Sequence, residues 1–160
     1  MRRILLGAAV LGLLTASCID DFEQAAVTAG QDGGLRVVYY PCAARRPAET
    51  VQLLVDDGDT LGDGNEMVLW EAKAASDPIQ VSELMTFGPT TLPGGYSETV
   101  HLRTPARGRK VAVYMTFRGG GSFTARFSWG ALDEGKLLTD DGTKTPAEWL
   151  RYAREGCGGG

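Results

Sequence analysis

This sequence has few histidines and cysteines, the residues on which much catalytic and metal-binding chemistry depends. It has one histidine, His101, and three cysteines, at positions 18, 42 and 157. A Ser-His-Asp triad would have to use His101, and no Gly-x-Ser-x-Gly elbow is present. The cysteine spacing matches neither a zinc motif nor a thiol-redox motif. These absences argue against a triad hydrolase, a zinc protein and a thiol oxidoreductase.

The sequence also lacks a hydrophobic run long enough to span a membrane. Residues 4–16 are uncharged and mostly apolar, but a spanning helix needs roughly 20 such residues. The positive charges of Arg2 and Arg3 precede this run, and the small residues 15–17 follow it. This order of charge, apolar run and small residues is typical of a signal peptide. We therefore expect residues 1–17 to direct export and then to be removed.

The end of this segment, Leu14-Thr15-Ala16-Ser17-Cys18, resembles the lipobox of bacterial lipoprotein precursors. The family pattern usually places leucine three residues before the cysteine, where this chain has Thr15. The resemblance covers residues 1–18 only. It implies cleavage before Cys18, acylation of that residue, and an extracytoplasmic protein anchored to the bacterial cell membrane. The alternative is plain secretion after an ordinary signal peptide, whose small-residue rule Thr15 and Ser17 also satisfy.

Lipidation of Cys18 would leave an even number of cysteines, Cys42 and Cys157. Disulfides persist in the compartment to which the signal points, so we expect these two residues to form a disulfide. Removal of residues 1–17 also takes away two arginines and no acid, which makes the mature chain more negative than the net charge of −4 of the whole chain. We expect no nucleic-acid partner for such an acidic chain.

The remaining sequence predicts one folded domain. We expect a lipidated N-terminus and flexible tether at 18–34, a single domain at 35–157 and a flexible tail at 158–160. Short β-like segments alternate with turn signals, which predicts an all-β antiparallel β-sandwich of about seven or eight strands, jelly-roll or immunoglobulin-like. The predicted strands are 35–42, 49–56, 65–73, 79–87, 96–103, 110–118, 122–130 and a weaker one at 135–139.

Two local patterns are the clearest. Apolar residues alternate with others along 110–118 and 122–130, and the three glycines 119–121 lie between these segments, which predicts an antiparallel hairpin. Thr145-Pro146-Ala147-Glu148 is a capping box with proline at the first helical position. It predicts a short C-terminal helix that ends near Glu155, with Gly156 just after it. The stripe of Trp149, Leu150, Ala153 and Cys157 would face the first predicted strand.

The acidic turn 56–66 is the strongest candidate for a metal site. It contains four aspartates, one glutamate and three glycines, and carboxylates on a flexible loop are ligands that Ca²⁺ prefers. Asp57, Asp59 and Asp63 are the candidate ligands. The segment does not match an EF-hand, and acidic glycine-rich turns are also ordinary solvated hairpin ends. Calcium is the one cofactor that the sequence suggests, and a protein without any cofactor is the alternative.

Other side chains suggest surfaces. His101 lies on the same face of its predicted strand as Thr99 and Arg103, opposite Val100 and Leu102, so it should face solvent. Arg103, Arg107, Arg109 and Lys110 surround a turn that could contact anionic headgroups or an acidic partner. Tyr40 and Tyr114 lie opposite the apolar faces of their strands, so they are candidates for an exposed ligand patch.

The leading functional hypothesis is a non-enzymatic, membrane-anchored binding or envelope-associated module with an unknown ligand. The alternative is a carbohydrate- or Ca²⁺-dependent ligand-binding β-sandwich. A hydrolase with paired carboxylates and no catalytic histidine is the third hypothesis.

Overall fold

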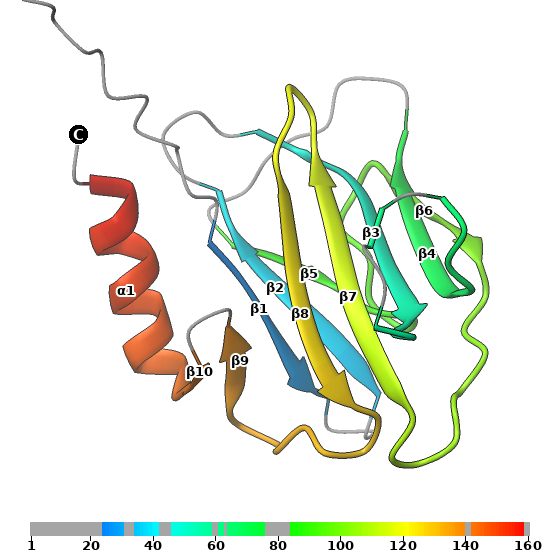
Figure 1. The fold of residues 1–160 in the computed structure, drawn as a ribbon. Helices are drawn as coiled ribbons and strands as arrows, with labels where there is room; N and C mark the ends of the chain where they lie inside the picture. The colour runs from blue at the N-terminus through cyan, green and yellow to red at the C-terminus, as the bar shows by residue number, and fades with distance from the viewer. Residues whose placement is uncertain are drawn as a thin grey trace, which may run out of the picture.

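The computed structural model is a sandwich of two antiparallel sheets with one C-terminal helix (Figure 1). It describes residues 24–30, 34–41, 46–58, 61–62, 64–75, 84–139 and 142–158. The expected all-β sandwich is therefore confirmed. Among the described residues, no helix is long and apolar enough to cross a membrane.

Sheet A contains five strands in the order β10-β9-β1-β2-β5. The strand bounds are β1 Gln24–Ala29, β2 Leu35–Tyr40, β5 Met85–Phe87, β9 Leu137–Thr139 and β10 Gly142–Lys144.

Sheet B also contains five strands, in the order β6-β4-β3-β7-β8. Its strand bounds are β3 Ala48–Val55, β4 Val68–Ala74, β6 Tyr96–Val100, β7 Lys110–Phe117 and β8 Ser122–Ser128. Figure 1 shows this sheet in front, with sheet A behind it.

The two sheets enclose the main hydrophobic core, because alternate residues of each strand point inward. Every second residue of β7 from Val111 to Phe117 is buried, as the alternation predicts. The β7–β8 hairpin is confirmed, with unbroken pairing from Lys110↔Ser128 to Thr116↔Ser122. Gly119, Gly120 and Gly121 all have positive φ, which explains why this turn consists of glycine.

The predicted tether 18–34 is wrong for its central part. β1 lies inside that range and pairs with β2 along its whole length, from Gln24↔Tyr40 to Ala29↔Leu35. Ala25, Ala26 and Val27 are buried. Their small side chains gave no strong hydrophobic pattern, yet small residues fit where a strand has both faces covered. The described domain therefore begins at Gln24, and the predicted tether shortens to residues before it.

The C-terminal helix α1, Pro146–Gly158, begins at the predicted capping box. The Glu148 carboxylate accepts from the Thr145 backbone N–H at 2.8 Å, and the Glu148 N–H donates to Thr145 Oγ1 at 3.3 Å. The predicted end was wrong, because α1 continues through Gly156 to Gly158. Gly156 is not among the glycines with positive φ, so it does not form the expected C-terminal cap.

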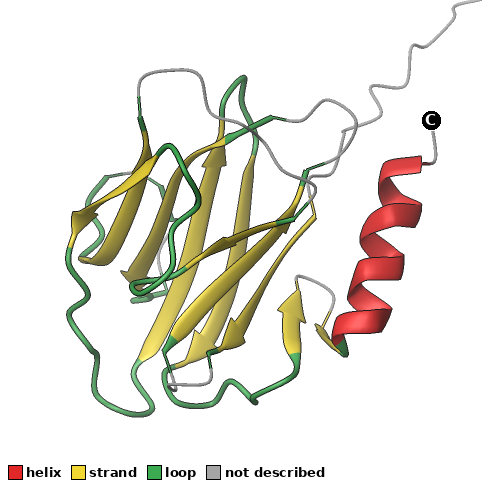
Figure 2. Ribbon diagram, turned by 180° about the vertical axis from the view of Figure 1, so that it is seen from behind, coloured by secondary structure: helices red, strands yellow, loops and turns green. Residues whose placement is uncertain are grey.

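α1 packs on the outer face of sheet A (Figure 2). Trp149 and Ala153 form a second, smaller core with Ala26 of β1 and Leu137 of β9. Val38 and Tyr40 of β2 also pack against this cluster, so the helix meets the strand that the sequence predicted as its partner. The outer faces of the two sheets therefore differ, because the only helix among the described residues covers sheet A.

Candidate functional site

Two rows of polar side chains cross all five strands on the outer face of sheet B. We call these ten side chains the polar face, and the strand register aligns nine of them. The tenth, Thr99, lies at a register shift next to Val100, the partner of Glu71, and joins the second row through its hydrogen bond to Glu71. The first row is Ser122, Thr116, Thr50, Lys73 and Ser97, and the second is Thr124, Tyr114, Gln52, Glu71 and Thr99. All ten are hydroxyl, amide or charged groups, although β-strands admit apolar residues on either face. This polar face is the candidate functional site.

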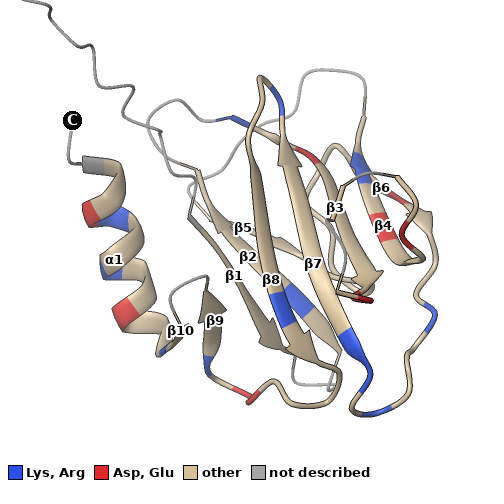
Figure 3. Cartoon of the chain, viewed as in Figure 1, with Lys and Arg blue, Asp and Glu red and all other residues tan. Residues whose placement is uncertain are grey.

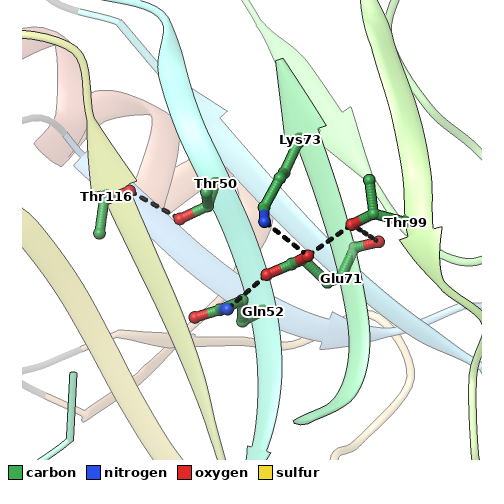
Figure 4. Close-up of polar contacts among 6 residues, drawn as sticks. All are labelled: Thr50, Gln52, Glu71, Lys73, Thr99 and Thr116. Atoms are coloured by element: carbon green, nitrogen blue, oxygen red, sulfur yellow. Dashed lines mark hydrogen bonds and ion pairs between the residues drawn. The ribbon is translucent and has the colours of Figure 1, made fainter. Parts of the chain in front are cut away.

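Glu71 is the centre of the second row (Figure 4). Its Oε1 accepts from Thr99 Oγ1 at 2.5 Å and lies 3.1 Å from Lys73 Nζ. Its Oε2 accepts from Gln52 Nε2 at 2.6 Å. The Glu71 side chain is 9% exposed, so a carboxylate on the outside of the sandwich is almost fully enclosed by its neighbours.

These neighbours keep Glu71 ionised. Burial alone would raise the pKa of its carboxyl group, because removal from water disfavours the charged form. Hydrogen bonds from Thr99, Gln52 and Lys73, together with the positive charge of Lys73, outweigh this effect and lower the pKa below its ordinary value of 4.5. Glu71 is thus a fixed anion whose two oxygens orient the groups around it.

Thr50 and Thr116 form a second contact on the polar face. Their Oγ1 atoms lie 2.6 Å apart, with either one as donor (Figure 4). One hydroxyl hydrogen is shared within the pair, and the other hydroxyl keeps its own hydrogen to donate. The pair therefore offers both a donor and acceptor lone pairs at the surface.

In the next row toward the β3–β4 loop, the residues of β3 and β7 are apolar and covered, whereas Arg126 of β8 is exposed and pairs with Asp56. Leu54 and Ala112 are paired across β3 and β7 on the same outer face, yet both are buried. The loop comes close to this region, because a Cβ atom at Gly62 would lie 2.6 Å from Tyr114 Oη. Gly62 also has a φ of +92°, so both space and backbone geometry require glycine there. The loop therefore limits the polar face to two rows.

The described carboxylates of the acidic turn 56–66 contact other groups of the protein, both within the turn and outside it. Asp57 pairs with Arg109 at 3.0 Å, and Asp56 pairs with Arg126 at 3.4 Å. The Glu66 carboxylate accepts from the backbone N–H groups of Gly62 and Gly64. Asp59 and Asp63 lie outside the described residues, and within the described ones no group of three or more His, Cys, Asp or Glu could hold a metal ion. Calcium binding by Asp57, Asp59 and Asp63 stays a prediction.

His101 faces solvent, as predicted, with 93% of its side chain exposed. Its Nδ1 lies 2.6 Å from Glu98 Oε2, and Glu98 Oε1 accepts from Trp70 Nε1 at 2.9 Å. No serine hydroxyl is among these contacts, so they do not form a Ser-His-Asp arrangement. Glu71 and Glu98 are each bound by donors, and neither contacts another carboxylate in these interactions.

The predicted aromatic patch of Tyr40 and Tyr114 is wrong. Tyr40 belongs to β2 of sheet A and packs against the cluster under α1, whereas Tyr114 belongs to β7 of sheet B. The two side chains lie on opposite outer faces, because successive residues of a strand alternate and the core faces of both strands are fixed by Tyr39 and Val113. Tyr114 belongs to the polar face, and Tyr40 does not.

The basic turn lies at the end of the sandwich opposite to the start of β1 (Figure 3). β7 begins beside this turn at Lys110 and ends at Phe117, whose ring centroid is 5.2 Å from that of Tyr39. Tyr39 adjoins Tyr40, which pairs with Gln24. The basic turn therefore lies at the end of the sandwich opposite to Gln24, the first of the described residues.

The cysteines are only partly within the described residues. Cys157 lies in the last turn of α1 and is half-buried, while Cys18 and Cys42 fall outside the described ranges. The lipid site at Cys18 and the Cys42–Cys157 bridge therefore stay predictions.

Comparison with known proteins gives no relative: no family model, no curated protein and no solved structure matches this chain.

Sequence reasoning missed nine of the ten polar-face residues. A signal was present, because Thr50 and Gln52 alternate with Val51 and Leu53, and Thr116 alternates with Met115 and Phe117. What the sequence could not supply is the strand order, which brings residues more than 60 positions apart into one row.

Proposed function

We propose that the protein is an extracytoplasmic bacterial lipoprotein, anchored to the membrane through lipid on Cys18, whose domain binds a ligand and catalyses no reaction. The order of positive charge, apolar run, small residues and cysteine in 1–18 supports the anchor. The polar face is the observation that carries the binding role.

The polar face suits binding better than catalysis. Its one carboxylate, Glu71, is held as an anion by three neighbouring side chains, whereas a general acid needs a pKa raised toward the working pH. A hydrolase with paired carboxylates would also need a second acid facing the first. The contacts of Glu71 are instead with a hydroxyl, an amide and an ammonium group.

Metabolic labelling with a fatty acid tests the anchor. The wild-type protein should incorporate palmitate and sediment with the envelope, because the lipid inserts its chains into the bilayer. The Cys18→Ser variant should be exported without label, and a Cys157→Ser variant is the control for labelling at another cysteine. Label that persists in Cys18→Ser would refute the anchor.

A further inference from the structure

The polar face carries almost no net charge over its whole area. Glu71 and Lys73 are its only charged members, and they neutralise each other at 3.1 Å. The other eight side chains are hydroxyls, a phenol and an amide. A surface of this kind gives no electrostatic attraction to a polyanion or to anionic lipid, since such binding depends on unpaired Lys and Arg. An uncharged ligand fits it better.

The groups of the polar face can both donate and accept hydrogen bonds. Gln52 gives one amide hydrogen to Glu71 and retains its carbonyl oxygen and a second hydrogen. Thr99 donates its hydroxyl hydrogen to Glu71 and retains its lone pairs. The Lys73 ammonium is half-exposed and has hydrogens beyond the one directed at Glu71. Sugar hydroxyls need this mixture, because each of them is also both donor and acceptor.

Rigid placement strengthens this match. Glu71 holds the Gln52 amide and the Thr99 hydroxyl in fixed positions through its two oxygens, and the Thr50–Thr116 pair fixes two further hydroxyls. A ligand therefore meets groups that lose little conformational freedom on binding. Half-buried Tyr114 lies beside Gln52 in the same row and adds an apolar ring against which the C–H face of a sugar can pack.

The rows are long enough for an extended ligand. Each runs over five strands, and neighbouring strands lie about 4.8 Å apart, so a row spans roughly 19 Å. We propose that the polar face binds an uncharged glycan chain that lies across the strands of sheet B. This inference rests on the proposed function, since it names the ligand class of that binding domain.

Retention on insoluble glycans tests the proposal. The lipidated protein is purified in a detergent without a sugar headgroup and sedimented with uncharged glycans of glucose, mannose, galactose or N-acetylglucosamine. We expect retention on at least one of these, and release by its soluble hexasaccharide. Retention should persist at about 1 M salt, where the Debye length is only ~3 Å. A polyuronate serves as the anionic comparison.

Variants of the polar face identify the surface that binds. Gln52→Ala and Tyr114→Ala should each weaken retention about tenfold, which corresponds to the loss of one good contact. Thr124→Val on the edge strand β8 is the milder variant if either of these fails to fold, as judged by thermal unfolding. The matched control is Thr86→Val on β5, where a threonine alternates with buried Met85 and Phe87 on the outer face of sheet A. This control should bind as the wild type does.

Three results would overturn the proposal: no retention on any uncharged glycan, retention only on the polyuronate with release by salt, or equal retention by wild type and the polar-face variants. None of these results would touch the anchor at Cys18, which fatty-acid labelling tests separately. A wild-type protein that incorporates no fatty-acid label but is still retained on a glycan would instead refute the anchor and leave the glycan site standing.

Discussion

Glu71 occupies a position where a strand residue would normally face water freely. Its 9% exposure results from the close approach of Gln52 on β3, Thr99 on β6, and Lys73 on β4, the strand that carries Glu71 itself. A carboxylate so enclosed is stable only while all its partners remain, because an unpaired charge removed from water is costly. The polar face therefore contributes to stability as well as to any binding.

The lowered pKa of Glu71 predicts acid sensitivity. Its ionised form interacts favourably in the folded state, so this stabilisation is complete above the ordinary pKa of 4.5 and is lost as the pH falls through the lower folded pKa. Glu71→Gln should reduce the free energy of unfolding by about 1–3 kcal/mol at neutral pH. The difference from wild type should shrink in acid.

Urea unfolding at a series of pH values measures this effect. Glu49→Gln is a suitable control, because Glu49 lies on the neighbouring β3 and is exposed. A difference between Glu71→Gln and wild type that stays constant from neutral pH to well below 4.5 would contradict the assigned role of the carboxylate.

At the scale of single elements, β8 is an edge strand, and the backbone hydrogen bonds at its two ends show which of its N–H groups bond to β7. The Phe117 N–H donates to the Gly121 carbonyl at 3.3 Å, and the Trp129 N–H donates to the Arg109 carbonyl at 2.8 Å. Because hydrogen-bonded pairs alternate in an antiparallel ladder, the N–H of Ala125 points toward β7 and that of Thr124 points away from it.

Proline substitution tests this assignment of the N–H groups of Thr124 and Ala125. Thr124→Pro removes an N–H that β7 does not use, whereas Ala125→Pro removes a hydrogen bond of the ladder. Ala125→Pro should therefore lower the melting temperature clearly more than Thr124→Pro does. Each variant can be compared with alanine or glycine at the same position. A larger loss for Thr124→Pro than for Ala125→Pro would mean that the register is shifted by one residue, and an equal loss would contradict the assignment.

The sequence predicted best those elements whose signal is local. The β7–β8 hairpin follows from alternation and three glycines, and the start of α1 follows from Thr145 and Glu148. β1 was missed because Ala25 and Ala26 have little apolar surface, although the fold buries both. The end of α1 was misplaced because Gly156 permits a cap without requiring one. The polar face depends on strand order, which is not a local property.

At the scale of the molecule, two cores share sheet A. The main core lies between the sheets, and the smaller one joins α1 to β1, β2 and β9. Of the residues that the structure describes, four are buried in the smaller core: Ala26, Leu137, Trp149 and Ala153. A helix docked on so few residues would gain from a covalent link, which the predicted Cys42–Cys157 bridge would supply.

This bridge predicts a defined response to reduction. It would close a loop of roughly 115 residues, for which chain-entropy estimates give about 4–5 kcal/mol of stabilisation. Reduction should lower the melting temperature, and Cys42→Ser should lower it equally without a further effect of reductant. Mass spectrometry of non-reduced peptides from the exported protein should find Cys42 joined to Cys157. Two thiols that react with an alkylating agent under native oxidising conditions would rule the bridge out.

The direction in which the chain enters the sandwich determines what the polar face can reach. Gln24 pairs with Tyr40 at the end that carries the β7–β8 turn, and the row from Ser122 to Ser97 is the one nearer to that end. With the proposed anchor at Cys18, six residues precede Gln24, and even a fully extended chain of that length spans only about 20 Å. The eight residues of β7 add roughly 26 Å. The polar face would thus sample a layer a few nanometres thick above the bilayer, and its natural ligand should be sought among molecules that are held within, or can enter, that layer.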